Sequence, residues 1–315
     1  MELGGLKASA VGIGAWQAGG RAWAVDKGEL AKAYARAFEL GINFVDTAEL
    51  YGAGESEKFV GRIVRKFGDV IVATKVAGYN WGRVEKAVRA SLERLGRVDL
   101  LQLHWPPPFY APLCKAIRDM EKLAEQGAVA EIGVSNFDAG LLWRAAECLK
   151  RREIVSNQVE YNLFNRAAES EEFKRAAAEL GIKIIAWSPL AKGAVLGRWG
   201  KDFARRMDPA YKKAASPAGR ELVKLVGEIA AKLGASPAQV TLAWLICKGA
   251  LPIPGVKTVR QAEDAAAAMR LQLSDADVSA LDEASNRFTG RRISSGGIRY
   301  VPGFLQRIIL QHIPI

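Results

Sequence analysis

The stretch ELAKAYARAFEL-G-INFVD, residues 29–46, shows the unit from which this chain is built. Apolar residues recur at three- and four-residue spacing from Leu30 to Phe38, which predicts a helix with one buried face. Gly41 follows and favours the end of that helix, because glycine readily adopts the left-handed conformation found there. The β-rich run INFVD comes next. A helix, a glycine and a buried strand in succession are typical of α/β proteins.

Short β-rich runs of this kind occur eight times along the chain. Most do not alternate between apolar and polar residues, which predicts parallel strands buried on both faces. The runs cover residues 11–15, 42–46, 70–76, 98–104, 131–135, 154–159, 183–187 and 251–253. Amphipathic segments between them predict helices, including residues 29–40, 83–95, 138–150 and 172–180 and a helix that begins at Ser236-Pro237.

Eight such units in 315 residues predict an α/β fold, a (β/α)8 barrel that forms one domain over residues 1–315. Gly4-Gly5 predicts a small N-terminal hairpin within residues 1–10, and residues 292–315 are expected to form a C-terminal tail that either packs on the barrel or covers the pocket. The long segment 192–219 is a candidate active-site flap. The alternative is an open doubly wound sheet, but Gly12-Ile13-Gly14 lacks the third glycine expected of its dinucleotide fingerprint.

The chain carries a formal net charge of +11, which suggests an anionic partner. Lys and Arg are scattered and mixed with acidic residues, so we expect no nucleic-acid binding; a phosphorylated small molecule fits better. No apolar run approaches the length of about 20 residues that a membrane helix needs, and no signal peptide is evident. We therefore expect a cytoplasmic protein. The composition leaves the oligomeric state open. Abundant Ala, Arg and Glu favour a thermophilic source.

Three cysteines and two histidines limit the covalent and metal chemistry. The cysteines, Cys114, Cys148 and Cys247, form no C-x-x-C pair, which predicts reduced thiols rather than a disulfide framework or a zinc site. Only two histidines, His104 and His312, are present, so a transition-metal site built on imidazole is not expected.

Polar residues recur at the ends of the predicted strands. Asp46, Lys75 and His104 are each separated by 29 positions, and the same spacing separates Gln158 from Trp187. In a β/α barrel the carboxyl ends of the strands meet at one rim, where active sites are built. The repeated spacing therefore predicts that these side chains share one rim.

Tyr51 lies five residues after Asp46, in the loop above that strand. A phenol has an ordinary pKa of about 10, and a neighbouring ammonium such as Lys75 is expected to lower it. Asp46 would hold that ammonium in place, and His104 would hydrogen-bond a substrate oxygen beside the phenol. This set is suited to protonating a developing alkoxide.

The residues around these positions resemble those of the aldo-keto reductases. The stretches NFVDTAELYG (43–52), ATKV (73–76) and LHW (103–105) occur in the order and spacing of that family, and the similarity runs through nearly the whole chain. The resemblance implies an NADP(H)-dependent oxidoreductase that reduces aldehydes or ketones to alcohols. It also implies a catalytic tetrad of Asp46, Tyr51, Lys75 and His104, with Tyr51 as the general acid in reduction and the general base in oxidation.

The same resemblance implies a row of cofactor contacts. One group lies along the nicotinamide, its ribose and the pyrophosphate, with Trp187 where the family often has a stacked tyrosine. A second group, in and after the motif IPGVKT (253–258), would bind the 2′-phosphate and adenine, and its cationic and hydroxyl donors favour NADP(H) over NAD(H). Ala265 departs from the asparagine usual after the acidic residue of this motif. The implied contacts are Gly14, Ala15, Trp16, Ser135, Asn136, Gln158, Trp187, Ser188, Leu190, Lys192, Gly193, Lys257, Thr258, Arg260, Gln261 and Asp264.

Four tryptophans, Trp16, Trp23, Trp81 and Trp105, are candidates for the wall of a pocket that accepts a small carbonyl or alcohol substrate. Two other functions stay open. A cofactor-binding regulatory subunit of the same fold would bind NADP(H) with little turnover. A sugar-phosphate barrel could use Lys75 for Schiff-base chemistry, although that leaves Asp46, Tyr51 and His104 without a purpose.

Overall fold

The computed structural model describes residues 1–19, 25–197, 209–288, 293 and 300–306. Its first elements are two short antiparallel strands, β1 (Glu2–Leu3) and β2 (Leu6–Lys7). Gly4, in the left-handed region at φ +59°, makes the turn between them. The N-terminal hairpin expected from the sequence is therefore confirmed.

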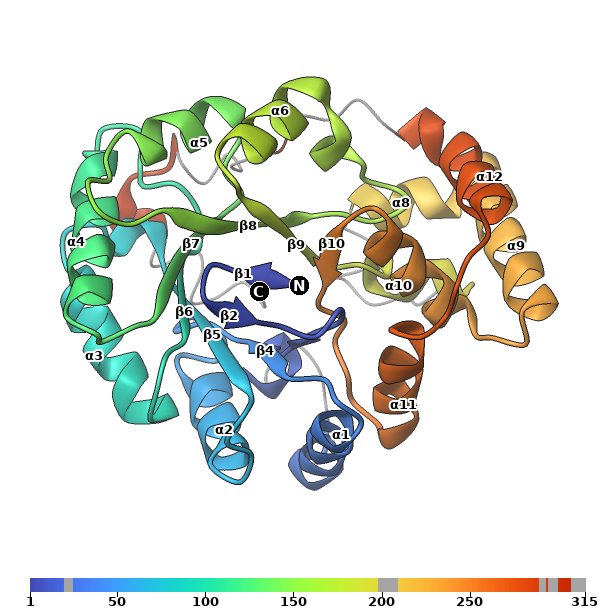
Figure 1. Cartoon of the computed structure of the whole chain (residues 1–315), viewed down its shortest axis with the longest axis horizontal. Coiled ribbons are helices and arrows are strands. Elements are labelled where there is room, and N and C mark those ends of the chain that lie inside the picture. The colour runs from blue at the N-terminus through green and yellow to red at the C-terminus, as the bar shows by residue number, and fades with distance from the viewer. Residues whose placement is uncertain (20–24, 198–208, 289–292, 294–299, 307–315) are drawn as a thin grey trace.

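Eight strands follow and pair in parallel, each with its neighbour in the chain (Figure 1). They are β3 (Ile13–Gly14), β4 (Phe44–Asp46), β5 (Ile71–Val76), β6 (Leu100–Leu103), β7 (Glu131–Ser135), β8 (Ile154–Glu160), β9 (Lys183–Trp187) and β10 (Ala250–Pro252). The first and last strands meet, because Gly12 N donates to Pro252 O and Gly14 N to Pro254 O, both at 3.0 Å. The sheet thus closes into the expected (β/α)8 barrel, and each predicted strand is confirmed.

Helices surround the barrel and alternate with its strands (Figure 1). They are α1 (Lys27–Glu39), α2 (Glu55–Val64), α3 (Val84–Leu95), α4 (Leu113–Glu125), α5 (Ala139–Ala146), α6 (Glu171–Glu179), α8 (Pro209–Ala215), α9 (Pro217–Lys232), α10 (Pro237–Cys247), α11 (Val259–Ala268) and α12 (Asp275–Ser285). The predicted caps are present: Asp138 accepts from Leu141 N at 2.9 Å, and Ser236 forms a reciprocal capping box with Gln239.

One predicted helix ends early. Residues 138–150 were expected to be helical, but α5 stops at Ala146. The carboxylate of Glu121, on α4, accepts the backbone N–H groups of residues 150, 151 and 152 at 2.7, 2.7 and 3.2 Å. By accepting these three N–H groups, the carboxylate holds the chain in a turn that leads from α5 towards β8.

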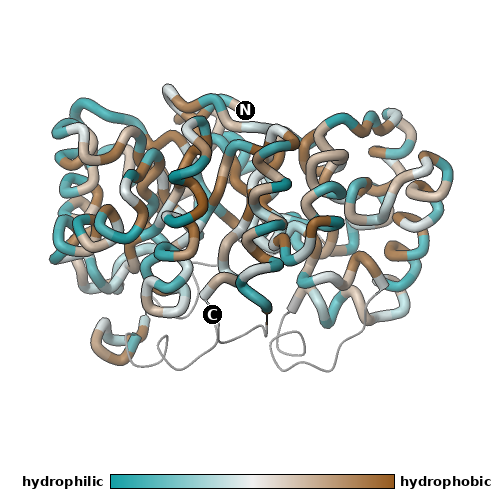
Figure 2. The backbone as a smooth tube through the Cα atoms, turned by 90° about the horizontal axis from the view of Figure 1, so that it is seen from below, coloured by the Kyte–Doolittle hydropathy of each residue, from teal (hydrophilic) through white to brown (hydrophobic). Residues whose placement is uncertain are grey.

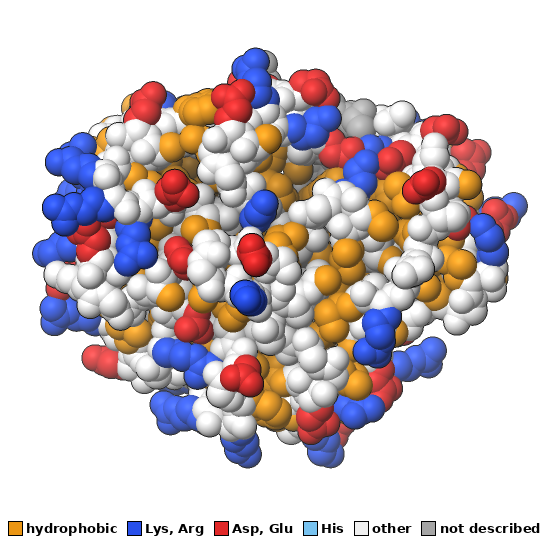
Figure 3. Space-filling view, viewed as in Figure 1, with side chains coloured by type: hydrophobic (Ala, Val, Ile, Leu, Met, Phe, Trp, Pro, Cys, Tyr) orange, Lys and Arg blue, Asp and Glu red, His pale blue; other side chains and the backbone are white. Residues whose placement is uncertain are grey.

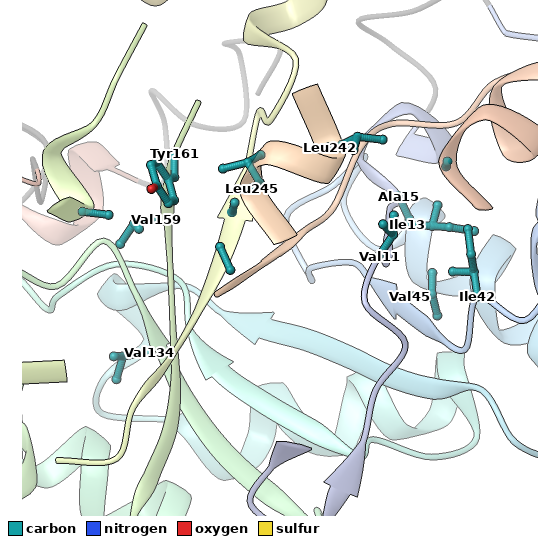
Figure 4. Packing of buried hydrophobic residues seen from close by; sticks show 14 of the residues in the cluster. Val11, Ile13, Ala15, Ile42, Val45, Val134, Val159, Tyr161, Leu242 and Leu245 are labelled. Atoms are coloured by element: carbon teal, nitrogen blue, oxygen red, sulfur yellow. The ribbon is translucent and has the colours of Figure 1, made fainter. Parts of the chain in front are cut away.

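The apolar core has two layers, one on each side of the sheet. Outside the barrel, strand residues such as Val45 and Val134 pack against the helices (Figure 4). Inside it, Phe44, Leu100 and Ile185 cluster with Leu3 of the hairpin, which is fully buried. The hairpin lies at one end of the barrel (Figure 2), so that end is plugged by apolar side chains and the opposite rim carries the polar ones.

The expectation of reduced cysteines is wrong for two of the three. Cys114, at the start of α4, forms a disulfide with Cys148, just after α5, and Cys247 is free and exposed. The two half-cystines are 34 residues apart in sequence, so no local motif marks them. Their Cα atoms come within 5.0 Å because α4 and α5 are neighbours in the ring of helices.

On the face shown in Figure 3, acidic side chains are interspersed among the Lys and Arg side chains. Across the described ranges, no single helix is long and apolar enough to cross a membrane; α9 and α10 meet that test only jointly, as a pair bent by 96°. The same described ranges contain no group of three His, Cys, Asp or Glu residues that could hold a metal ion.

Candidate active site

The polar rim of the barrel brings together the residues that the 29-residue spacing singled out. Asp46 ends β4, Lys75 lies next to the end of β5, and His104 directly follows β6. All three side chains are buried. In the register of the sheet, Asp46 pairs with Ala73 and Lys75 with Gln102. Lys75 and His104 therefore each lie two residues beyond the partner of the preceding site residue, and all three lie at the carboxyl ends of adjacent parallel strands.

Lys75 is the centre of the cluster. Its ammonium donates to Asp46 Oδ2 at 2.5 Å, to the main-chain oxygen of Thr47 at 2.8 Å and to the Tyr51 hydroxyl at 3.2 Å. An ammonium has three protons, so each has an acceptor. Burial by itself lowers the pKa of Lys75, but the carboxylate of Asp46 and the Tyr51 oxygen together raise it above its ordinary value. The side chain therefore stays charged at neutral pH.

The Tyr51 hydroxyl oxygen accepts a hydrogen bond from Lys75, so its own hydrogen can be donated to another group. Lys75 Nζ also lies 4.8 Å from the centroid of the Tyr51 ring, and the His104 ring stands edge-on to it at 5.6 Å. Burial raises the pKa of the Tyr51 phenol, and the charge of Lys75 offsets only part of that rise. The expected net lowering is therefore wrong, because desolvation of the phenolate outweighs the nearby ammonium.

His104 is an uncharged partner beside the phenol. Burial, with the nearby charge of Lys75, holds the pKa of its imidazole well below the ordinary 6.5. Its buried Nδ1 has no hydrogen-bond partner within the described part of the chain. A neutral imidazole offers one donor and one acceptor, so this ring can receive an outside ligand without carrying charge into the site.

The second oxygen of Asp46 is held by two glutamines. Oδ1 accepts from Gln158 Nε2 at 2.8 Å and from Gln102 Nε2 at 2.9 Å, and the two amides bond each other at 3.2 Å. Gln158 was expected from the sequence, whereas Gln102 was missed. The available signal was its position two residues before His104, which places both side chains on the same face of the strand.

The predicted nicotinamide-binding residues also form one network. Ser135 Oγ donates to the main-chain oxygen of Gln158 at 2.8 Å, and Asn136 Nδ2 donates to the main-chain oxygen of His104 at 3.2 Å. Trp187 donates its indole N–H to Asn136 Oδ1 at 3.1 Å. Asn136 adopts a left-handed φ of +59°, which turns its amide towards both neighbours. The indole thus does more than a stacked phenyl ring could, because it also orients this amide.

The loop after β9 has an unusual backbone. Ser188, Ala191, Lys192 and Gly193 all have positive φ, between +46° and +90°, and Leu190 lies among them. Ala191 N donates to Ser188 O at 3.0 Å and Gly193 N to Leu190 O at 2.8 Å, so the loop is built from two successive tight turns. The buried Ser188 Oγ has no partner within the described ranges, so its hydroxyl is a donor that a phosphate could use.

The first strand lies against the last at the same rim. A Cβ on Gly14 would stand 2.9 Å from the main-chain oxygen of Ile253, so only glycine allows this approach. Ala15 is buried and accepts from Ser56 Oγ at 2.6 Å. Trp16 follows in the short 3-10 helix η1 (Trp16–Gly19), with Lys192 Nζ 5.9 Å from its ring.

The N-terminus of α11 carries the predicted 2′-phosphate residues. Thr258 caps the helix by accepting from Gln261 N at 3.3 Å, and Lys257 N donates to Gln261 Oε1 at 2.8 Å. Arg260 is exposed, and the first turn contains no acidic residue, which suits an anion at a helix N-terminus. Asp264, in contrast, accepts from Gln239 Nε2 at 2.7 Å and Ser236 Oγ at 3.1 Å, a contact that joins α11 to α10.

Three of the four predicted pocket tryptophans can be placed. Trp16 and Trp81 are half-buried, and Trp105 is buried with its ring 4.8 Å from the His104 ring. Trp23 lies outside the described residues. Trp105 Nε1 donates to Gln306 Oε1 at 3.1 Å, so part of the C-terminal tail lies against the wall next to His104.

This closed β/α barrel carries a buried phenol, a buried ammonium and a neutral imidazole on its rim, which are groups suited to proton transfer. Comparison with known proteins identifies the family. The sequence profile described as "Aldo/keto reductase family" matches residues 10–286, and the chain belongs to that family. It is thus a member of a family of oxidoreductases, as the sequence resemblance implied.

Relatives match over most of their length. The chain is 34% identical to a chloroplastic pyridoxal reductase of Arabidopsis thaliana, over 90% of this chain and 85% of that protein. It is 32% identical to an NADP(+) aldo-keto reductase of Schizosaccharomyces pombe, over 89% and 87%. A solved aldo/keto reductase from Klebsiella pneumoniae, in complex with NADP and acetate, superposes with a TM-score of 0.71 at 28% identity, covering 87% of this chain and 90% of that one.

Proposed function

We propose that this chain is a single-domain, NADP(H)-dependent reductase of small aldehydes and ketones, with Tyr51 as its proton donor, and that it works in the cytoplasm. The observation that carries the proposal is that the Lys75 ammonium donates hydrogen bonds to three acceptors, one of which is the Tyr51 hydroxyl. Because Asp46, Thr47 and Tyr51 accept all three, the Tyr51 hydroxyl hydrogen is left to be donated to a substrate.

The reduction needs a hydride at the carbonyl carbon, which NADPH supplies when bound, and a proton at the carbonyl oxygen. Tyr51 gives that proton, so an alcohol forms and a phenolate remains. Lys75, 3.2 Å from the phenolic oxygen, stabilises the phenolate, and Asp46 balances the ammonium charge. In the reverse direction the same phenolate accepts the alcohol proton.

The pKa directions define the protonation states of the pair. Burial keeps the Tyr51 pKa above its ordinary value, so the phenol is protonated at neutral pH, while the charge of Lys75 acts in the opposite direction by stabilising the phenolate that forms when the proton is donated. The neutral His104 imidazole can donate a hydrogen bond to the carbonyl oxygen without competing as an acid. The phenol and the imidazole thereby hold the substrate oxygen from two sides.

We assign one part of the cofactor to each of three places on the rim: the ends of β7, β8 and β9, the loop after β9, and the N-terminus of α11. Ser135, Asn136 and Gln158 would hold the carboxamide, and Trp187 would stack on the ring. The loop from Ser188 to Gly193 would lie along the pyrophosphate, where the unpartnered Ser188 hydroxyl supplies a donor. The preference for NADP(H) would come from contacts with the 2′-phosphate at the N-terminus of α11, made by Lys257, Thr258, Arg260 and Gln261. The NADP bound in the Klebsiella pneumoniae structure agrees with this choice.

A screen of NADPH oxidation over aldehydes, ketones and sugars tests the activity. The aromatic surface of Trp105, whose ring lies 4.8 Å from the His104 ring, favours aromatic aldehydes, and pyridoxal belongs in the panel because one relative is a pyridoxal reductase. Replacing Tyr51 by Phe should lower kcat by about 10²- to 10⁴-fold, with little change in the affinity for NADPH. A fully active Tyr51→Phe enzyme would refute the proposed acid.

Two further results would redirect the proposal. A chain that binds NADPH tightly but consumes none with any carbonyl would favour the alternative of a regulatory subunit. Equal affinities for NADPH and NADH, measured by titration of the protein fluorescence, would refute the 2′-phosphate site at α11.

A further inference from the structure

We propose that Gln102 is a positioning residue that couples the Asp46–Lys75 pair to the nicotinamide-binding amide of Gln158. It touches neither the substrate nor the reacting atoms and acts through these neighbours. The inference rests on the proposed function, because it extends the same site inward by one side chain.

The contacts of Gln102 carry the inference. Its side chain is fully buried inside the barrel, and Nε2 donates to Asp46 Oδ1 at 2.9 Å while Oε1 accepts from Gln158 Nε2 at 3.2 Å. Gln158 Nε2 also reaches Asp46 Oδ1 at 2.8 Å. The three groups therefore form a closed triangle, in which the amide at position 102 donates to the carboxylate and accepts from the other amide.

The barrel makes room for this amide. Register places Lys75, Gln102 and Gly133 side by side on three successive strands. A Cβ on Gly133 would stand 3.3 Å from Gln102 Cγ and 2.4 Å from Ser156 Oγ, so a larger residue would crowd the space that the glutamine occupies. The absence of a side chain at Gly133 thus belongs to the same arrangement as the presence of Gln102.

The triangle has two consequences. First, Asp46 keeps one oxygen on Lys75 and the other on two amides, so the carboxylate cannot rotate away from the ammonium. Second, the amide nitrogen of Gln158 is turned towards Asp46, which leaves its oxygen for the amino group of the nicotinamide carboxamide. Loss of Gln102 should therefore disturb the chemical step and the binding of the cofactor together.

Gln102→Met tests the coupling, because methionine keeps the length of the side chain and removes both hydrogen bonds. We expect kcat to fall about 10- to 100-fold, which is the effect of removing one hydrogen bond to a charged group. The Kd for NADP+ should rise about 3- to 10-fold. Leu103→Met is the matched control: it is buried on the same strand but faces the helices, and it should change the melting temperature without changing kcat or Kd.

A double-mutant cycle with Gln158→Met separates coupling from simple loss of packing. If Gln102 acts through Gln158, the double variant should bind NADP+ no more weakly than Gln158→Met alone. Fully additive effects on Kd, or a Gln102→Met enzyme with wild-type kcat and Kd, would overturn the inference.

A measurement on the unaltered chain covers the case in which Gln102→Met does not fold. In a crystal structure with NADP+, Gln158 Oε1 should lie within hydrogen-bond distance of the carboxamide nitrogen while Gln102 remains on Asp46. A Gln158 amide turned away from the carboxamide would overturn the inference. A wild-type chain that reduces no carbonyl would instead defeat the proposed function, and the NADP+ binding results would still decide the role of Gln102.

Discussion

Replacing Cys114 by Ser removes the disulfide that joins the start of α4 to the end of α5, and should destabilise the chain by a predictable amount. The bond closes a loop between residues 34 positions apart. In the chain-entropy treatment, a cross-link of this span removes conformational entropy from the unfolded chain and so raises its free energy by about 4 kcal/mol at 25 °C. With an unfolding entropy of about 2.1 cal/mol/K per residue, that loss corresponds to a fall in Tm of about 6 °C for a chain of 315 residues.

Thermal melts of the oxidised wild type, the wild type with a reducing agent and Cys114→Ser measure this effect. The last two should melt at about the same temperature, below the first. Cys247→Ser is the matched control, because Cys247 is an exposed free thiol and its loss should leave Tm unchanged. Thiol titration of the denatured, unreduced wild type should find one free thiol. Three free thiols, or a Tm that does not respond to reductant, would refute the reasoning.

Three other predictions concern the site and its scaffold. Because the pKa of His104 lies well below 6.5, kcat/KM should show no His104-dependent change between about pH 6 and 8; a histidine-like inflection in a pH profile, lost in His104→Gln, would contradict this. Burial raises the pKa of Glu169, but its hydrogen bonds, led by those from Arg166, lower it below the ordinary 4.5. The stability that the ionised Glu169 carboxylate contributes is therefore present above about pH 4.5 and lost as the pH falls through its lowered pKa. Urea melts should find Glu169→Gln less stable by about 2 kcal/mol at pH 7, with a smaller difference near pH 3. Trp187→Phe keeps the stacking surface but loses the donor to Asn136, so the Kd for NADP+ should rise about 3- to 10-fold by fluorescence titration; an unchanged Kd would count against the orienting role of the indole.

The strands and their order could be predicted because each is marked within a short window. The run INFVD after Gly41 is apolar and β-rich whatever the rest of the chain does, and the same holds for the other runs. The rim residues were also predictable. The two β/α units between Asp46 and His104 each span 29 residues, so Asp46, Lys75 and His104 all fall at the carboxyl ends of successive strands.

What only the tertiary structure decided are the contacts between segments far apart in sequence. Asp46 meets Gln158 across 112 positions and Trp105 meets Gln306 across 201, and no local pattern marks either pair. Burial decided the direction of the Tyr51 pKa in the same way, because desolvation depends on everything packed around the phenol. The sequence by itself thus determined the barrel and the chemical groups on its rim. Closure of the sheet decided which group holds which, since hydrogen bonds form only once distant strands lie side by side.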